Sequence, residues 1–130
     1  MNRASIPGVA GLYVSLLPTI IEIGKLCGYA IGVHGTASHD FDLIAVPWVH
    51  NAIPASDFIN RIKDHFGGYI EQGGVTVRAQ CPERKVHGRV AWSIYFNPSF
   101  TGPYIDISVM PRIDYETNKI IEEINENNTW

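Results

Sequence analysis

The order of the apolar segments along the chain restricts the folds that it can adopt. A stretch with helical spacing of leucine and isoleucine comes first, and two short apolar runs bounded by glycine or proline follow it. A second amphipathic stretch then precedes three further strand-like runs and a last helical segment. This order of helix, strand, strand, helix, three strands and helix is typical of an α+β domain. We therefore predict a mixed sheet of about five strands with helices packed on one face.

The same pattern sets bounds for the predicted elements. Gly28 follows the first helix as a C-terminal glycine would, and Gly67-Gly68 is expected to end the second helix. Pro18 either kinks the first helix or begins its second half. The last three strands are expected to form an antiparallel group. We expect helices at Leu12 to Leu26, Ala55 to Phe66 and Tyr115 to Asn125, and strands at Tyr29 to His34, Phe41 to Trp48, Val75 to Gln80, Arg89 to Phe96 and Tyr104 to Met110.

Length, composition and charge limit the classes of function. The 130 residues, 45% of them hydrophobic, suit a single domain, residues 1 to 130, whose core spans about residues 12 to 110. The net charge of −3 argues against general binding to nucleic-acid backbones, which needs a basic surface, although a small nucleotide needs only a few local cations. Five carboxylates against one lysine make residues 114 to 130 an acidic C-terminal helix or tail.

Cysteine usage and hydropathy favour a cytoplasmic protein. Cys27 and Cys81 form no Cys-x-x-Cys or zinc-ligand pattern, and the N-terminus has no signal-peptide pattern, so both thiols are expected to be reduced and structural. Pro18, Glu22 and Lys25 interrupt the long apolar stretch, which is then too short to cross a bilayer. We therefore expect no membrane contact.

Three acidic residues suggest a site for a divalent cation. Asp40 and Asp42 begin a predicted strand two positions apart, so their side chains should share one face with Cα atoms roughly 6.5–7 Å apart. Asp106 lies inside a strongly apolar strand, where an ionised carboxylate is costly without a partner or a metal. If the two strands are neighbours, the three carboxylates converge and offer oxygen ligands to Mg²⁺ or Mn²⁺. The alternative is that Asp40 only ends a turn and that Asp42 is solvated.

The spacing of these residues resembles the nucleotidyltransferase superfamily related to DNA polymerase beta. In that family a strand ends in Gly-Ser, Asp-x-Asp begins the next strand, and a third acid lies on a later strand. The corresponding residues here are Gly35-Thr36, Asp40-Phe41-Asp42 and Asp106, and the resemblance covers about residues 12 to 110. The resemblance implies that the three acids are catalytic ligands of two metal ions, with Asp106 on the catalytic ion. It also implies that Gly35 and Thr36 bind phosphate.

Residues between the Gly-Thr pair and the acids are further candidates for nucleotide binding. Ser38 and His39 lie in this link, and His39 is a better candidate than His34, which we interpret as a strand histidine with ordinary partners. Only three residues separate Thr36 from Asp40, fewer than in the family.

One basic cluster and three aromatic residues complete the candidates. Residues 78 to 89 hold four of the ten lysines and arginines, and Arg78 and Arg89 either contact phosphate groups or lie in a solvated loop. Three aromatic residues are interpreted as core or rim residues, of which one could stack on a nucleobase: Trp48, Trp92 and Tyr104.

Two functions of different classes are consistent with this pattern. The first is a minimal metal-dependent nucleotidyltransferase that moves a nucleoside monophosphate to a protein or other acceptor, as in small phage or antitoxin-type members of the family. The second is a non-catalytic protein that sequesters a nucleotide or cyclic nucleotide signal, which the short link before Asp40 favours. A metal-dependent phosphoesterase that uses His39 is a weaker third hypothesis. In an enzyme, a partner protein or a second copy of the chain would supply the acceptor-binding part.

Overall fold

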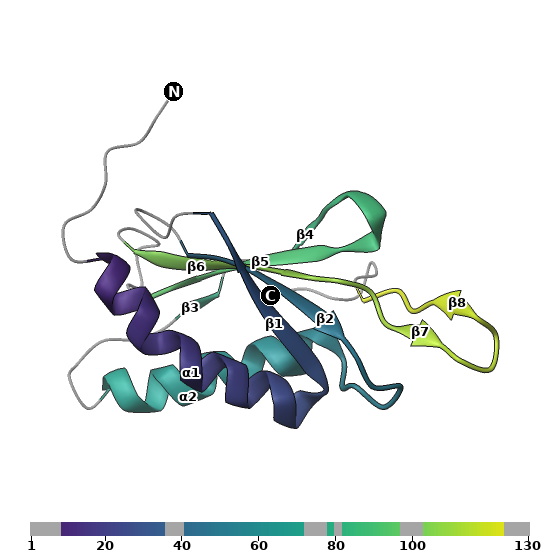
Figure 1. The fold of residues 1–130 in the computed structure, drawn as a ribbon, viewed down its shortest axis with the longest axis horizontal. Helices are drawn as coiled ribbons and strands as arrows, with labels where there is room; N and C mark the ends of the chain where they lie inside the picture. The colour runs from purple at the N-terminus through teal and green to yellow at the C-terminus, as the bar shows by residue number, and fades with distance from the viewer. Residues whose placement is uncertain (1–8, 36–40, 72–77, 80–81, 97–102, 124–130) are drawn as a thin grey trace.

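The computed structural model describes residues 9–35, 41–71, 78–79, 82–96 and 103–123. Two helices and eight strands, several of them only two residues long, make up this part of the chain (Figure 1). A single turn of 3₁₀-helix separates two of the strands. The elements are α1 (Val9–Cys27), β1 (Tyr29–His34), β2 (Phe41–Pro47), α2 (Ala55–Glu71), β3 (Arg78–Ala79), β4 (Glu83–Arg84), the 3₁₀ turn (Val86–Gly88), β5 (Val90–Tyr95), β6 (Tyr104–Val109), β7 (Ile113–Asp114) and β8 (Lys119–Ile120).

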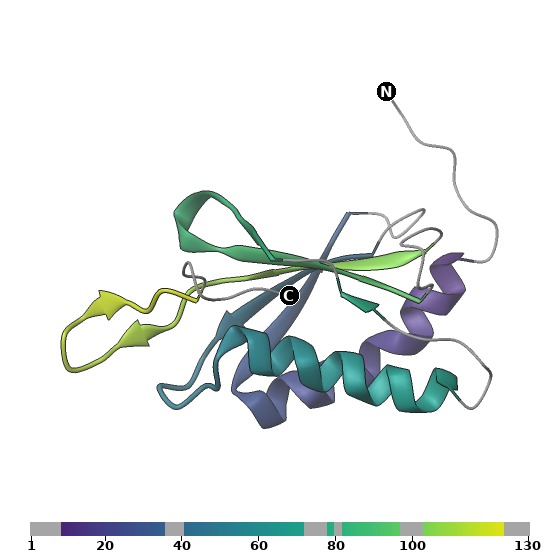
Figure 2. The same ribbon diagram turned by 180° about the vertical axis from the view of Figure 1, so that it is seen from behind.

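The main sheet is mixed, as predicted. Its strands follow the order β1-β2-β6-β5-β3, and β4 pairs with β5 beside this path. The β2–β6 pair is parallel, whereas the other pairs are antiparallel. Both helices lie on one face of the sheet, as the two opposite views show (Figures 1 and 2). The α+β prediction is therefore confirmed at the level of the sheet and its helical layer.

The hydrophobic core lies between the sheet and the two helices. Alternate residues of β2, β5 and β6 are buried toward the helices, because successive strand residues point to opposite faces. Two stacked aromatic pairs join the layers: Tyr13 of α1 with Phe41 at a centroid distance of 5.0 Å, and Tyr29 of β1 with Phe58 at 4.7 Å. The remaining residues of these strands point to the face turned away from α1 and α2, which we call the open face.

Glycine ends one of the two helices but not the other. Gly28 takes a φ of +93° after α1, and a Cβ there would lie 2.7 Å from the Ala52 Cα, so only glycine fits. The predicted end of the second helix at Gly67-Gly68 is wrong, because α2 continues to Glu71. A glycine inside a helix costs only about 1 kcal/mol relative to alanine. The buried Phe66 immediately before the pair holds this turn of α2 against the core.

The predicted helix at Tyr115 to Asn125 is also wrong for its described part. Residues 113–120 form the β7–β8 hairpin, and residues after 123 lie outside the described part of the chain. The Asp114 carboxylate accepts a hydrogen bond from the Glu116 N–H at 2.9 Å, and its carbonyl accepts one from Asn118 at 2.6 Å. Asn118 adopts a φ of +57°. These local bonds give the backbone a turn in place of a helix.

A buried ion pair attaches the segment after the hairpin to α2. The Arg112 guanidinium donates to both carboxylate oxygens of Glu123, at 2.5 and 3.3 Å, and also to the Ala52 carbonyl at 3.2 Å. The second carboxylate oxygen of Glu123 accepts a hydrogen bond from the Ala55 N–H at the start of α2, at 3.3 Å. Glu123 therefore joins two segments that are far apart in the sequence.

The structure also bears on the expectations for the cysteines, for the strand at Val75 to Gln80 and for membrane contact. Cys27 is buried and free, and burial raises the pKa of its thiol, which is consistent with the structural role that we predicted. Cys81 lies outside the described residues, as does most of the strand expected at Val75 to Gln80, of which β3 is the described part. Among the described residues, neither helix has the length and apolar character that crossing a membrane requires.

Tyr29 should make stability fall in alkaline solution. Burial raises the pKa of the Tyr29 phenol far above its ordinary value, and the Glu123 charge adds to the increase. The phenol also donates a 2.7 Å hydrogen bond to the Ile53 carbonyl. Above a pH of about 10, the unfolded chain releases this proton while the folded chain keeps it, so the unfolding free energy should fall by up to about 1.4 kcal/mol per pH unit.

Guanidinium unfolding at pH 8 and pH 11 tests this expectation. Tyr29→Phe should lose about 1 kcal/mol at pH 8 with the hydrogen bond, and should show a smaller further loss at pH 11 than the wild type. Tyr115→Phe, at an exposed tyrosine, leaves Tyr29 in place and is the control. An identical alkaline loss in the wild type and in Tyr29→Phe would contradict the assignment.

Candidate functional site

Four polar residues form a row across the open face, which we call the polar row: His34, Asp42, Asp106 and Ser93. The register of the sheet places them as successive partners: His34 of β1 opposite Asp42 of β2, Asp42 opposite Asp106 of β6, and Asp106 opposite Ser93 of β5. Register partners on neighbouring strands point to the same face. The polar row thus crosses four adjacent strands, β1, β2, β6 and β5, at the position of Asp42.

Asp42 and Asp106 are direct neighbours, as we predicted from strand parity. Both carboxylates are half-buried, and their strands run parallel at a spacing of about 4.8 Å. Two like charges at this separation repel each other, and the repulsion falls when a cation binds between them. Asp40, the third predicted ligand, lies outside the described residues.

Gly35, the residue directly after β1, lies against the Asp42 carboxylate. Gly35 adopts a φ of +82°, and a Cβ at this position would lie 3.3 Å from Asp42 Oδ2. Glycine is therefore favoured here both by its backbone conformation and by the close approach of the carboxylate. Gly35, the first residue of the predicted phosphate-binding pair, is therefore next to an acid. The other predicted nucleotide-binding residues of this segment, Thr36, Ser38 and His39, lie outside the described residues.

The donor atoms of the polar row fit a hard divalent cation. Asp42 and Asp106 supply carboxylate oxygens, the ligand type that Mg²⁺ and Mn²⁺ prefer. Within the described residues, no three His, Cys, Asp or Glu side chains converge on one point. The described part of the site thus contains two carboxylates, which would hold a cation from one side only.

A stacked aromatic pair lies next to the polar row on the same face. Tyr104 precedes Asp106 by two residues on β6, and its register partner is Tyr95 of β5. The two rings have a centroid distance of 4.8 Å and an interplanar angle of 25°. Of the other aromatic candidates, Trp92 is in the core with 1% exposure, and Trp48 is 66% exposed just beyond the opposite end of β2. Tyr104 is the candidate that the sheet brings to the acids.

The predicted basic residues are only in part close to the acids. Arg89 donates to the Ser108 hydroxyl at 3.4 Å, and Ser108 lies on the open face two residues beyond Asp106. Arg78 pairs with Tyr95 through β3, and nothing is described of its side chain. Arg84, in the same cluster, forms an exposed ion pair with Glu122 at 3.0 Å. Arg84 and Lys85 lie in the exposed β4–β5 hairpin, as the solvated alternative predicts, and Arg89 is half-buried at the end of this hairpin.

Two residues of this surface were not assigned to a site from the sequence. His34 was interpreted as a strand histidine, and it does lie in β1, whereas Tyr95 was not singled out. The strand register places both residues on this surface: His34 is the register partner of Asp42, and Tyr95 is that of Tyr104. Strand parity could have placed each residue on a face, but the pairing of one strand with another depends on the loops and on the core.

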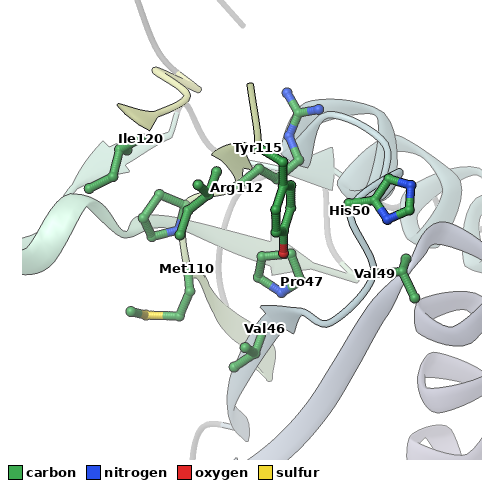
Figure 3. A pocket seen from close by; sticks show the side chains of 10 residues that line it. Val46, Pro47, Val49, His50, Met110, Arg112, Tyr115 and Ile120 are labelled. Carbon is green, nitrogen blue, oxygen red and sulfur yellow. The ribbon is translucent and has the colours of Figure 1, made fainter. Parts of the chain in front are cut away.

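A cavity lies at the other end of β2 from the polar row. This cavity of about 390 Å³ is mostly apolar and is bounded by the end of β2, the segment after β6 and the β7–β8 hairpin (Figure 3). The His50 and Tyr115 rings meet edge to face at its rim, at 5.8 Å and 76°. Its one guanidinium, that of Arg112, is bound to Glu123. None of the residues predicted for nucleotide or metal binding lines this cavity.

Comparison with known proteins finds no family model and no curated protein that matches the chain. The geometry of the open face therefore carries the functional argument.

Proposed function

We propose that this protein binds a nucleoside triphosphate with Mg²⁺ or Mn²⁺ and transfers the nucleoside monophosphate to an acceptor hydroxyl on a protein or other molecule. The observation that carries the proposal is the direct pairing of Asp42 with Asp106 on the open face. Each acid lies half-buried among mostly apolar residues of its strand. Their arrangement agrees with the chain order of acids that resembles the nucleotidyltransferase superfamily.

The residues of the site have distinct parts in this proposal. Asp42 and Asp106 would hold the divalent cation, which when bound neutralises charge on the nucleotide phosphates. Gly35 lets the backbone turn close to Asp42, where a phosphate can approach main-chain amides. Arg89, held by Ser108, adds positive charge on the same face. Neither described helix covers the open face, so an acceptor can approach it (Figure 2).

The proposed transfer is a single displacement at phosphorus. The acceptor oxygen forms a bond to the α-phosphorus, and the bond from that phosphorus to the bridging oxygen breaks. Pyrophosphate leaves with the bonding electrons, and the hydroxyl proton passes to water. The acceptor then carries the nucleoside monophosphate.

A non-catalytic nucleotide-binding protein is the second candidate. It is favoured by the short link, in which three residues separate Thr36 from Asp40. A short link offers fewer backbone amides to hold a triphosphate in line for transfer. In this case the protein would sequester a nucleotide or cyclic nucleotide and return it unchanged.

Turnover and binding can be separated with one pair of variants. The wild type, incubated with MgCl₂ or MnCl₂ and each of the four nucleoside triphosphates, should release pyrophosphate or label a protein acceptor, and Asp106→Asn should abolish this activity. Asp64→Asn removes an exposed carboxylate from α2 and is the matched control with full activity. A nucleotide that raises the melting temperature of the wild type but is recovered unchanged would support the binding protein instead. Equal activity of Asp106→Asn and the wild type would contradict the role of the acids.

A further inference from the structure

We infer that the nucleobase of the bound nucleotide stacks on the Tyr95–Tyr104 pair, so that the nucleotide lies across the strands with its phosphates toward β1 and its base toward β5. This inference rests on the proposed function and adds the orientation of the substrate to it. It also assigns the base a recognition surface made of π faces, which is tolerant of base identity.

The position of the tyrosine pair relative to the acids carries the inference. Tyr104 and Asp106 are two residues apart on β6 and point to the same face, roughly 6.5–7 Å from each other along the strand. Tyr95 stands in the same relation to Ser93, the end of the polar row on β5. The aromatic pair and the carboxylates are thus adjacent on one sheet surface.

The direction of the nucleotide follows from what lies on each side of the acids. On the β1 side, the Gly35 turn approaches Asp42 and offers backbone to a phosphate. Away from β1, two residues along β6 and β5 from Asp106 and Ser93, lie the phenol rings of Tyr104 and Tyr95, which favour a planar partner over an anion. A nucleotide has its charged phosphates at one end and its planar base at the other. The Gly35 side suits the phosphates, and the tyrosine side suits the base.

The burial of the two rings also distinguishes them from core aromatics. Both tyrosines are half-buried on the open face, whereas the aromatic residues on the helical side of the same strands, such as Trp92, are fully buried. The core holds the start of β6 independently of the Tyr104 ring, because the Tyr104 backbone N–H donates to the Tyr13 hydroxyl at 3.2 Å. Substituting the Tyr104 ring should therefore leave the strand in place.

The test compares a ligand that has a base with one that has none. The affinities of the wild type, Tyr104→Ala and Tyr104→Phe are measured by calorimetry with MnCl₂, for an ATP analogue with a methylene between the α and β phosphorus atoms and for inorganic tripolyphosphate. Tyr104→Ala should weaken the ATP analogue by about tenfold or more and leave tripolyphosphate unchanged, since base stacking is the interaction removed. Tyr104→Phe keeps the ring and should bind both ligands as the wild type does. Tyr115→Ala, at an exposed ring on the β7–β8 hairpin, is the matched control.

Each outcome separates this inference from the proposed function. Unchanged affinity of Tyr104→Ala for the ATP analogue, with normal binding by the wild type, would overturn the stacking and leave the proposed function standing. Equal weakening of both ligands would show a structural role for the pair and would also overturn it. A wild type that binds neither ligand would overturn the proposed function together with the inference. If Tyr104→Ala does not fold, Tyr104→Leu keeps the apolar bulk without the ring and takes its place.

Discussion

Replacing Glu123 with alanine is expected to lower the free energy of unfolding by about 3–5 kcal/mol, because it leaves a buried cation without its partner. The Glu123 side chain is 4% exposed and that of Arg112 is 19% exposed. Burial alone would lower the pKa of Arg112, but the hydrogen bond and charge of Glu123 raise it. The variant also removes the acceptor for the Ala55 N–H at the start of α2.

The adjacent residue provides the control for this prediction. Glu122 is 66% exposed and pairs with Arg84 at the surface, so Glu122→Ala should change the unfolding free energy by less than about 1 kcal/mol. Urea unfolding of both variants and the wild type, followed by circular dichroism, measures the difference. Similar losses in the two variants would show that the Arg112–Glu123 pair does not anchor the segment after the hairpin.

Asp42→Asn is expected to lower the affinity for Mn²⁺ by about tenfold or more without weakening the metal-free fold. Register partners on neighbouring strands have Cβ atoms about 5 Å apart, a separation at which two like charges repel by about 3 kcal/mol at an effective dielectric constant near 20, and solvent reduces this further for half-buried groups. Removing one charge relieves this repulsion, so the metal-free variant should equal the wild type or exceed it by about 1 kcal/mol. In the proposed site, the same change removes one of two carboxylate oxygen donors, which should weaken cation binding.

Melting curves with and without MnCl₂ measure both effects. The wild type should gain melting temperature with Mn²⁺, since a ligand that binds only the folded state stabilises it, and Asp42→Asn should gain little. Asp64→Asn removes one exposed carboxylate elsewhere and should keep the full response. If Asp42→Asn responds to Mn²⁺ as the wild type does, the acids are not cation ligands and the solvated alternative for Asp42 holds.

The two acids, Asp42 and Asp106, show which structural properties the local sequence pattern can predict. Alternation indicated on which side of its own strand each acid lies, and the apolar runs around Asp42 and Asp106 indicated strands buried on one side. Both properties follow from backbone geometry, which acts within a few residues. The same reasoning located α1, β1, β2, β5 and β6 to within a few residues at their ends.

The errors occurred where distant residues decided the local structure. Gly67 carries a local signal for a helix end, but the burial of Phe66 against the core overrides it. The isoleucines near residue 120 favoured a helix, whereas the turn at Asp114 and the anchoring of Glu123 by Arg112 produce a hairpin. Arg112 and Glu123 are 11 residues apart in the sequence. The spacing of apolar residues contains no information about an ion pair between them.

The sequence by itself determined the α+β class and the buried side of each main strand, because side-chain periodicity and burial cost are local properties. Only the tertiary structure decided that Asp42 and Asp106 are neighbours and that His34 and Tyr95 lie on the same surface, since this depends on which strands pair and in what register. Register is set by the packing of the whole core and by the connecting turns. These contacts join residues that no local pattern relates.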